Sequence, residues 1–199
     1  MKKNKIIVFV ESFIILPIMA TSVSVGNLPK TEVNIFSSSI IALSQSNIVS
    51  NINSTNSIED KTLEMQAEAI DAYFSAREMP LMGLGLKMAI EAKKNELDWR
   101  LLPAIAVRES TGGKFDCKKV DFNPFGWGSC KIGFKSNEEA IEIVAKNLGG
   151  NNPNTARYYD NKTVAQILRA YNPPSIVLHY VKQVMSIMNI IGDEEVYSK

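Results

Sequence analysis

The stretch Trp99–Cys130, WRLLPAIAVRESTGGKFDCKKVDFNPFGWGSC, joins a short apolar helix to a loop rich in glycine, aromatic residues and cysteine. The helix is predicted to begin at Asp98, a good N-cap residue, and to end at a Gly-Gly pair. Glu109 shares the apolar stripe of this helix with Leu102 and Ile105, at spacings of seven and four residues. Because Glu is usually found on the solvated face and near a helix N-terminus, its position here suggests a special role.

The surroundings expected for Glu109 favour a protonated carboxyl group. Partial burial disfavours the charged form, and so does the negative end of the helix dipole in the last turn. Both effects raise the pKa toward neutral, and each pKa unit corresponds to about 1.4 kcal/mol. A carboxylic acid that stays protonated near pH 7 suits a general acid in glycoside cleavage. The alternative is a boundary residue whose stem packs while its carboxylate reaches water.

The periodicity of apolar residues predicts an all-α domain over residues 58–199, because no convincing alternating run occurs there. The expected helices run from Ile58 to Pro80, from about Leu84 to Leu97, from Asp98 to Gly112, from Ser136 to Leu148, from about Thr163 to Tyr171 and from Ser175 to Ile191. Ser136 and Glu139 are expected to form a capping box, and Gly192 is expected to end the last helix.

The N-terminal 25 residues have the pattern of an export signal. Three lysines among the first five residues precede an apolar run, Ile6–Ala20. Glu11 and Pro17 interrupt this run, and it is shorter than the ~20 residues that span a bilayer, so a signal is favoured over a retained anchor, which stays open. Residues 26–57, rich in Ser, Asn, Ile and Val, are expected to form a linker. We therefore expect a secreted or envelope-associated protein.

The charge and the motif content exclude several functional classes. The formal net charge is +1, which argues against nucleic acid as the main partner. A dinucleotide-binding fingerprint and a P-loop are both missing from the sequence, and we expect no cofactor. We also expect a monomer.

The two cysteines, Cys117 and Cys130, both follow Glu109 in the loop. In an exported protein this pair predicts a disulfide bond, which would close a loop of about 14 residues and contribute roughly 3 kcal/mol. Metal ligation lacks partners, because the single histidine, His179, is far along the chain. We expect no metal site. Free thiols in a reducing compartment are the remaining alternative.

Aromatic residues accompany flexible backbone at two places. The loop Asn123–Gly128, NPFGWG, offers Phe125 and Trp127 beside glycines, and aromatic faces next to backbone donors suit sugar rings. The alternative is that both rings close a small core. At AYNPP, where two helices meet, the hydroxyl of Tyr171 is placed to orient a carboxyl group or a sugar substituent; capping and packing are the alternative.

Three segments resemble motifs of one superfamily. AIAVRESTGGK, Ala104–Lys114, is similar to the catalytic-helix motif of lysozyme-like hydrolases, in which a Glu-Ser pair ends a buried helix. NPFGWG is similar to the Asn-x-Phe-Gly motif of bacterial glucosaminidases (mannosyl-glycoprotein endo-β-N-acetylglucosaminidase-like domains). AYNPPS, Ala170–Ser175, resembles the Ala-Tyr-Asn motif of soluble lytic transglycosylases and goose-type lysozymes. The Gly-Leu-Met-Gln run typical of lytic transglycosylases is absent, which favours the glucosaminidase branch.

The resemblance implies a lysozyme-like helical domain, with a disulfide-braced active-site loop, that cleaves the β-1,4 backbone of N-acetylglucosamine (GlcNAc) and N-acetylmuramic acid (MurNAc) in peptidoglycan. Glu109 would be the general acid. The residues implied to bind substrate are Ser110, Asn123, Phe125, Trp127, Tyr171 and Asn172. Asp116 and Asp121 are candidates for a second carboxylate, unless an N-acetyl group or a hydroxyl of the substrate serves instead.

Several alternatives stay open at this point. One alternative is a lytic transglycosylase or a muramidase that acts on the same substrate, peptidoglycan. Outside catalysis, the chain would be a wall-binding module that keeps the cleft, or a disulfide-braced interaction domain without carbohydrate affinity.

Overall fold

The computed structural model describes residues 58–197, with side chains up to residue 193. In this part of the chain the backbone forms helices and loops, with no strand, so the predicted all-α class is confirmed for these residues. The expected signal and linker, residues 1–57, lie outside the described residues. None of the helices in the described part is long and apolar enough to span a bilayer.

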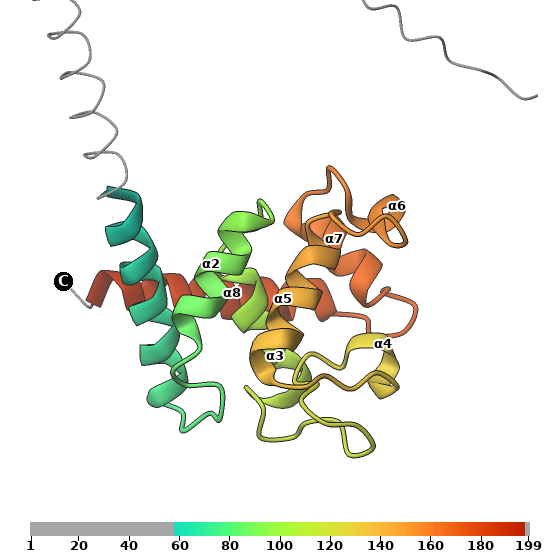
Figure 1. Cartoon of the computed structure of the whole chain (residues 1–199), viewed down its shortest axis with the longest axis horizontal. Helices are drawn as coiled ribbons and strands as arrows, with labels where there is room; N and C mark the ends of the chain where they lie inside the picture. Colours follow the sequence, from blue (N-terminus) through green and yellow to red (C-terminus); the bar gives the residue numbers. More distant parts are fainter. Residues whose placement is uncertain (1–57, 198–199) are drawn as a thin grey trace, which may run out of the picture. The chain divides into compact units, whose positions relative to one another are not determined.

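The helices follow the chain in the order drawn in Figure 1. They are the segment 58–75, α2 (Gly85–Lys94), α3 (Leu101–Ser110), α4 (Trp127–Cys130), α5 (Asn137–Leu148), α6 (Ala156–Tyr159), α7 (Val164–Tyr171) and α8 (Tyr180–Tyr197). The short helices α4 and α6 are additions to the elements expected from periodicity.

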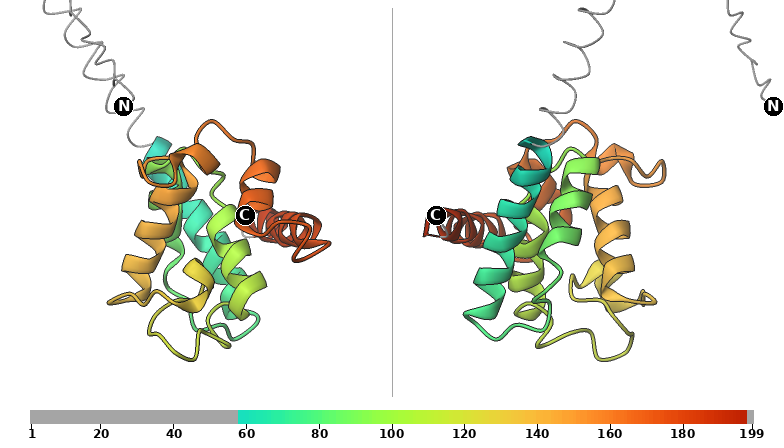
Figure 2. Two further views of the ribbon diagram at one scale, coloured as in Figure 1. Left: turned by 90° about the vertical axis from the view of Figure 1, so that its right-hand side faces the viewer. Right: turned by 60° about the vertical axis from the view of Figure 1, so that its left-hand side comes forward.

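Helix α3 forms the centre of the fold. Its first six residues, Leu101 to Ala106, are buried on all sides, as expected for a helix without a polar face. It packs against α2 and α8, while α2 also contacts α5 and α7 contacts α8. Figure 2 shows α8 running across the axes of the other long helices. Because the N-terminal part of α3 is enclosed, the side chains of its last turn mark the place where the core opens to the surface.

The start of α3 differs from the expectation. Asp98 is not the N-cap, because the helix begins at Leu101 and Arg100 occupies the N-cap position. Trp99 and Arg100 form a turn instead, closed by the bond from Leu101 N–H to the Asp98 carbonyl oxygen, 2.9 Å. The Asp98 carboxylate accepts from the backbone and from the guanidinium of Arg100, at 3.0 and 2.6 Å.

The last helix also differs from the expectation at both ends. The predicted range Ser175–Ile191 is wrong, since α8 begins at Tyr180 and continues past Gly192 to Tyr197. Residues 174–179 instead form turns that bond back to the carbonyl oxygen of Pro173. Gly192 serves close packing rather than termination, because a Cβ there would lie 3.1 Å from Nη1 of Arg100.

Other predicted boundaries match more closely. Ser136 caps α5 by accepting from Glu139 N–H, 3.3 Å, and Gly149 is the C-cap of this helix. The expected capping box is not completed, because the Glu139 carboxylate accepts from the N–H of Lys135, 2.6 Å, instead of from that of Ser136. Thr163 caps α7 in a full capping box with Gln166. The second helix is shorter than expected, ending at Lys94 rather than near Leu97.

Candidate functional site

Glu109 lies in the last turn of α3, at the wall of a groove of about 630 Å³. Its side chain is half-buried. The groove is bounded by the loop before α4, by α4 and α6, and by the C-terminal end of α7. The residues that line it are Glu109, Gly126, Trp127, Gly128, Ser129, Cys130, Thr155, Tyr158, Tyr159, Ala170, Tyr171, Asn172 and Ile176.

Gly126 lies directly against the carboxyl group of Glu109. A Cβ at this position would be 3.1 Å from Oε2 of Glu109 and 3.7 Å from its Cδ. The φ angle of Gly126 is 63°, in the left-handed region that favours glycine. The backbone conformation therefore favours glycine at this position, and a Cβ here would press on the Glu109 carboxyl group and make it shift.

Burial raises the pKa of the Glu109 carboxyl above its usual value, and the neighbouring Tyr180 hydroxyl and the charge of Arg108 oppose that shift. Oε1 of Glu109 is buried without a hydrogen-bond partner among the described residues, and the same holds for Oη of Tyr180. The two groups face each other closely enough to interact electrostatically, yet they form no hydrogen bond of normal geometry. The raised pKa means that the Glu109 carboxyl keeps its proton to higher pH than an exposed glutamate does.

The sequence analysis missed Tyr180, which lies beside Glu109, and also Thr155, Tyr158 and Tyr159, which line the groove. Tyr180 begins α8, only 2% of it is exposed, and its ring stacks on that of Tyr171 at 6.0 Å and 9°. Burial, followed by the Glu109 charge, raises the pKa of its hydroxyl, which therefore stays protonated at neutral pH. The available signal was its spacing of four residues from the buried Val184, which puts Tyr180 on the inner stripe of the helix.

Aromatic rings form the wall of the groove opposite α3. The ring of Trp127 lies between those of Tyr159 and Tyr171, at 6.3 and 5.7 Å. The Tyr171 hydroxyl donates to the carbonyl oxygen of Phe125, which ties α7 to the loop. Burial, and then the Glu109 charge, raise the pKa of Tyr171 well above 10.0, so this hydroxyl cannot act as a base near neutral pH.

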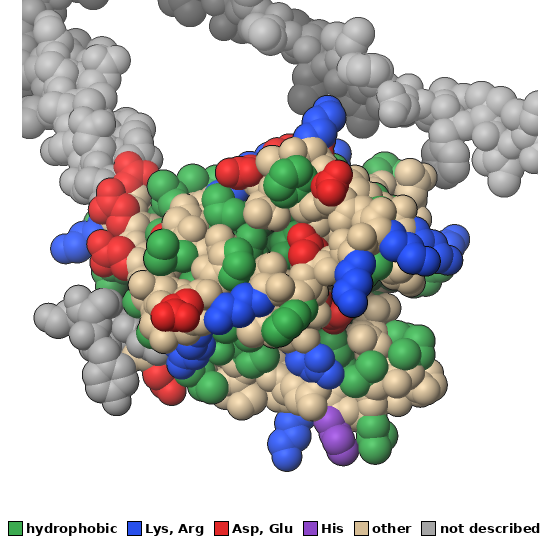
Figure 3. Space-filling view, turned by 90° about the horizontal axis from the view of Figure 1, so that it is seen from below, with side chains coloured by type: hydrophobic (Ala, Val, Ile, Leu, Met, Phe, Trp, Pro, Cys, Tyr) green, Lys and Arg blue, Asp and Glu red, His purple; other side chains and the backbone are tan. Residues whose placement is uncertain are grey.

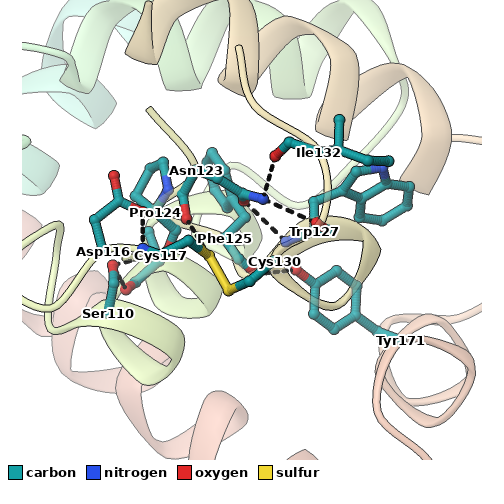
Figure 4. The surroundings of a disulfide bond; sticks show 11 residues. Ser110, Asp116, Cys117, Asn123, Pro124, Phe125, Trp127, Cys130, Ile132 and Tyr171 are labelled. Atoms are coloured by element: carbon teal, nitrogen blue, oxygen red, sulfur yellow. Dashed lines mark hydrogen bonds between the residues drawn. A yellow bond between two sulfur atoms is a disulfide. The ribbon is translucent and has the colours of Figure 1, made fainter. Parts of the chain in front are cut away.

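Three of the predicted binding residues, Ser110, Asn123 and Phe125, lie near the disulfide and are not part of the groove lining (Figure 4). Asn123 is fully buried; its Nδ2 donates to the carbonyl oxygens of Trp127 and Ile132, and its Oδ1 accepts from Trp127 N–H. Ser110 is buried with its Oγ 2.7 Å from the Pro124 carbonyl oxygen. Phe125 is 0% exposed. These side chains shape the loop and do not line the groove.

The predicted disulfide between Cys117 and Cys130 is confirmed, with the two Cα atoms 5.5 Å apart. It joins the beginning of the loop to the end of α4 (Figure 4). Ser129 and Cys130 have φ angles of 56°, as left-handed residues, and for a residue other than glycine this conformation costs roughly 1–2 kcal/mol. The disulfide thus holds the strained turn at Ser129 and Cys130, which forms part of the lining of the groove.

The two candidates for a second carboxylate lie outside the groove. Asp116 accepts from the backbone N–H of Cys117, 2.7 Å, and burial raises its pKa. Asp121 is exposed, and its carbonyl oxygen accepts from Phe134 N–H. Among the described residues that line the groove, Glu109 is the only carboxylate. Within residues 58–193, no group of three His, Cys, Asp and Glu side chains could hold a metal ion.

The structure thus brings four of the predicted site residues together around one groove: Glu109, Trp127, Tyr171 and Asn172. The chain was also compared with protein-family models, with curated protein sequences and with solved structures, and none of them matches it. Function is therefore inferred from the chemistry of the groove and from the three sequence motifs.

Proposed function

We propose that this protein is an exported glycosidase with a lysozyme-like fold that cleaves the β-1,4 glycan backbone of peptidoglycan, as glucosaminidases do. The observation that carries the proposal is the state of Glu109: half-buried, with a raised pKa and with Oε1 unbonded, in an aromatic-walled groove. A general acid needs its proton at the pH of the reaction and needs access to the leaving oxygen. The raised pKa of Glu109 favours the first requirement, and its place in the lining of the groove favours the second.

The walls of the groove suit a sugar chain. The half-buried Trp127 offers an aromatic surface on which the C–H face of a pyranose can stack, and Tyr158, 49% exposed, adds a second aromatic side chain to the lining. Thr155 and Asn172 add polar groups for hydroxyl and acetamido substituents. Pockets for sugars commonly combine flat apolar faces with a few placed polar groups.

In the proposed reaction Glu109 donates its proton to the glycosidic oxygen as the bond from that oxygen to the anomeric carbon breaks. The sugar passes through an oxocarbenium-like state. The leaving chain departs as an alcohol, and Glu109 becomes a carboxylate. This carboxylate then accepts a proton from the incoming water or sugar hydroxyl, which restores the enzyme.

The missing second carboxylate favours help from the substrate. The carbonyl oxygen of a GlcNAc acetamido group can attack the anomeric carbon of its own ring, which replaces an enzymatic nucleophile. Water then opens the resulting oxazolinium ring and gives a reducing GlcNAc end. If a hydroxyl of MurNAc attacks instead, the product is an anhydro end, as lytic transglycosylases form.

Analysis of the products tests the proposal and separates its branches. Purified peptidoglycan is incubated with the protein, and the released fragments are identified by mass spectrometry. Reducing GlcNAc ends support a glucosaminidase, anhydro-muramic ends a lytic transglycosylase, and reducing MurNAc ends a muramidase. An absence of new fragments contradicts the enzymatic proposal.

A non-catalytic wall-binding module is the second candidate, and the single carboxylate in the groove favours it. Such a module would be retained on peptidoglycan and release no fragment. Substitution of Trp127 by alanine would then weaken retention, because the ring is a central part of the wall.

A further inference from the structure

The turn between α7 and α8 carries two aliphatic side chains that project from the surface. Ile176 is 75% exposed and Leu178 is 73% exposed, although large aliphatic side chains are normally covered. The backbone of this turn is held in place, because the N–H groups of Ile176 and Val177 both bond to the carbonyl oxygen of Pro173. The two side chains therefore project from an ordered turn.

Basic residues surround this turn. A hollow of about 600 Å³ lies against it, lined in part by Leu178 and Met185 and by the basic residues Arg169, His179 and Lys182. Among the described residues that line the hollow, none is acidic. The three basic side chains are exposed, and they form no ion pair with another described residue. In Figure 3 the histidine projects at the lower edge of the molecule, between a basic and a hydrophobic side chain.

We propose that this turn, with the three basic residues around it, docks on a membrane surface that contains anionic phospholipids. Ile176 and Leu178 would insert among the lipids, while the basic side chains would contact phosphate groups. Aliphatic residues at a tip, with the cations Arg169 and Lys182 at its base, are an arrangement typical of interfacial membrane binding. The feature favours a membrane over an acidic protein, because a tip that projects offers little of the flat, closely packed area found in protein interfaces.

Docking would also orient the groove. Ile176 lines the groove that holds Glu109 as well as belonging to the turn, so the mouth of the groove would open beside the membrane. The docking proposal does not depend on the glycosidase proposal, since it shares only Ile176 with the groove, does not involve Glu109 and is tested by another measurement.

A reporter at the tip tests the proposal in the full chain. Leu178→Trp places an indole in the turn, and Ile90→Trp places one on α2, where the native side chain is also exposed, 41%. Each variant is mixed with vesicles of phosphatidylcholine, with or without phosphatidylglycerol, and quenching by brominated lipids is recorded against the unsubstituted protein. Residues 1–57 are identical in the two variants, so any affinity that they have for lipid is common to both, and the difference between the reporters shows which surface meets the bilayer.

With the anionic vesicles, we expect the fluorescence emission of the Leu178→Trp indole to shift to shorter wavelength and to be quenched by the brominated lipids. The emission of the Ile90→Trp indole should stay unquenched. Adding Lys182→Glu to the Leu178→Trp variant should raise the lipid concentration needed for half-maximal quenching about tenfold. The substitution removes one attraction to the anionic lipids and adds one repulsion. The same substitution at Lys146, which is exposed on α5, should change nothing. Circular dichroism checks that each variant is folded.

Three results would overturn the proposal. The first is equal quenching at positions 178 and 90, and the second is quenching that does not depend on phosphatidylglycerol. The third is salt-sensitive binding to soluble polyglutamate without any shift of the reporter on vesicles, which would indicate an acidic protein as partner.

Discussion

The loop at Gly126 passes close to the carboxyl group of Glu109, so that a Cβ added to Gly126 would lie only 3.1 Å from Oε2. Glu109 comes from the buried central helix and Gly126 from the disulfide-bonded loop, so the contact joins the two halves of the site. The position of the carboxyl group is therefore set by the loop as well as by its own helix.

Gly126→Ala should displace the Glu109 carboxyl. The matched control is Gly83→Ala, since Gly83 also has a positive φ, 90°, but has no atom within 4 Å of a Cβ. In both variants the free energy of unfolding, measured with urea, should fall by about 1 kcal/mol, because a backbone with positive φ is unfavourable for alanine. Only Gly126→Ala should also lower the rate of peptidoglycan digestion, by about tenfold. Equal activity in the two variants would mean that the contact with Glu109 has no functional role.

Tyr180→Phe should raise the pKa of Glu109 further, because it removes the hydroxyl that opposes the effect of burial. Activity that needs protonated Glu109 is lost as pH rises through this pKa. The alkaline limb of the pH–rate profile should therefore move to higher pH in Tyr180→Phe. In Tyr158→Phe, which changes an exposed ring, the limb should stay in place. If the alkaline limb moves in neither variant, the Tyr180 hydroxyl does not influence the pKa of Glu109, and the account of this pair is contradicted.

Glu109→Gln should stabilise the protein at alkaline pH. Since the folded-state pKa is raised above the ordinary value of 4.5, protonation favours the folded state. The wild-type protein therefore loses stability as pH rises from about this value through the folded-state pKa, whereas a neutral glutamine causes no such loss. Urea unfolding at pH 4 and pH 8 measures the effect, and the gain should appear only at pH 8. A similar gain in stability at pH 4 and at pH 8 would show that the charge of the Glu109 carboxylate is not the cause.

Loss of the disulfide should destabilise the domain by about 3 kcal/mol, the cost expected for releasing a loop of this length. The double variant Cys117→Ser, Cys130→Ser and the reduced wild-type protein should unfold at the same lower urea concentration. Because these are the only two cysteines of the chain, a reductant should have no effect on the double variant. If reduction leaves the wild-type midpoint unchanged, the bond does not brace the loop.

Local patterns were sufficient to predict the main elements of the fold. The apolar stripe placed Glu109 at the end of a buried helix, and the capping residue Ser136 marked the start of α5. Each of these signals lies within one or two turns of the residue concerned. The disulfide followed from chemistry, since the chain offers no other partner for either cysteine.

Contacts between distant segments could not be predicted in this way. Tyr180 reaches Glu109 only because α8 crosses α3, and Gly192 stays helical because it packs on Arg100. Asn123 was interpreted as a binding residue from its motif, whereas its amide is used for bonds to Trp127 and Ile132 within the loop. Spacing along the chain contains no information about such bonds.

The central claim is that Glu109 supplies the proton for glycan cleavage. Its most direct test is the digestion of purified peptidoglycan by the wild-type protein, by Glu109→Gln and by the control Glu68→Gln, which changes an exposed carboxylate on the helix 58–75. Loss of a general acid typically costs 10²–10⁴-fold in rate, so Glu109→Gln should release about a hundredth of the fragments or fewer, and Glu68→Gln should match the wild-type protein. Undiminished digestion by a folded Glu109→Gln protein would contradict the account.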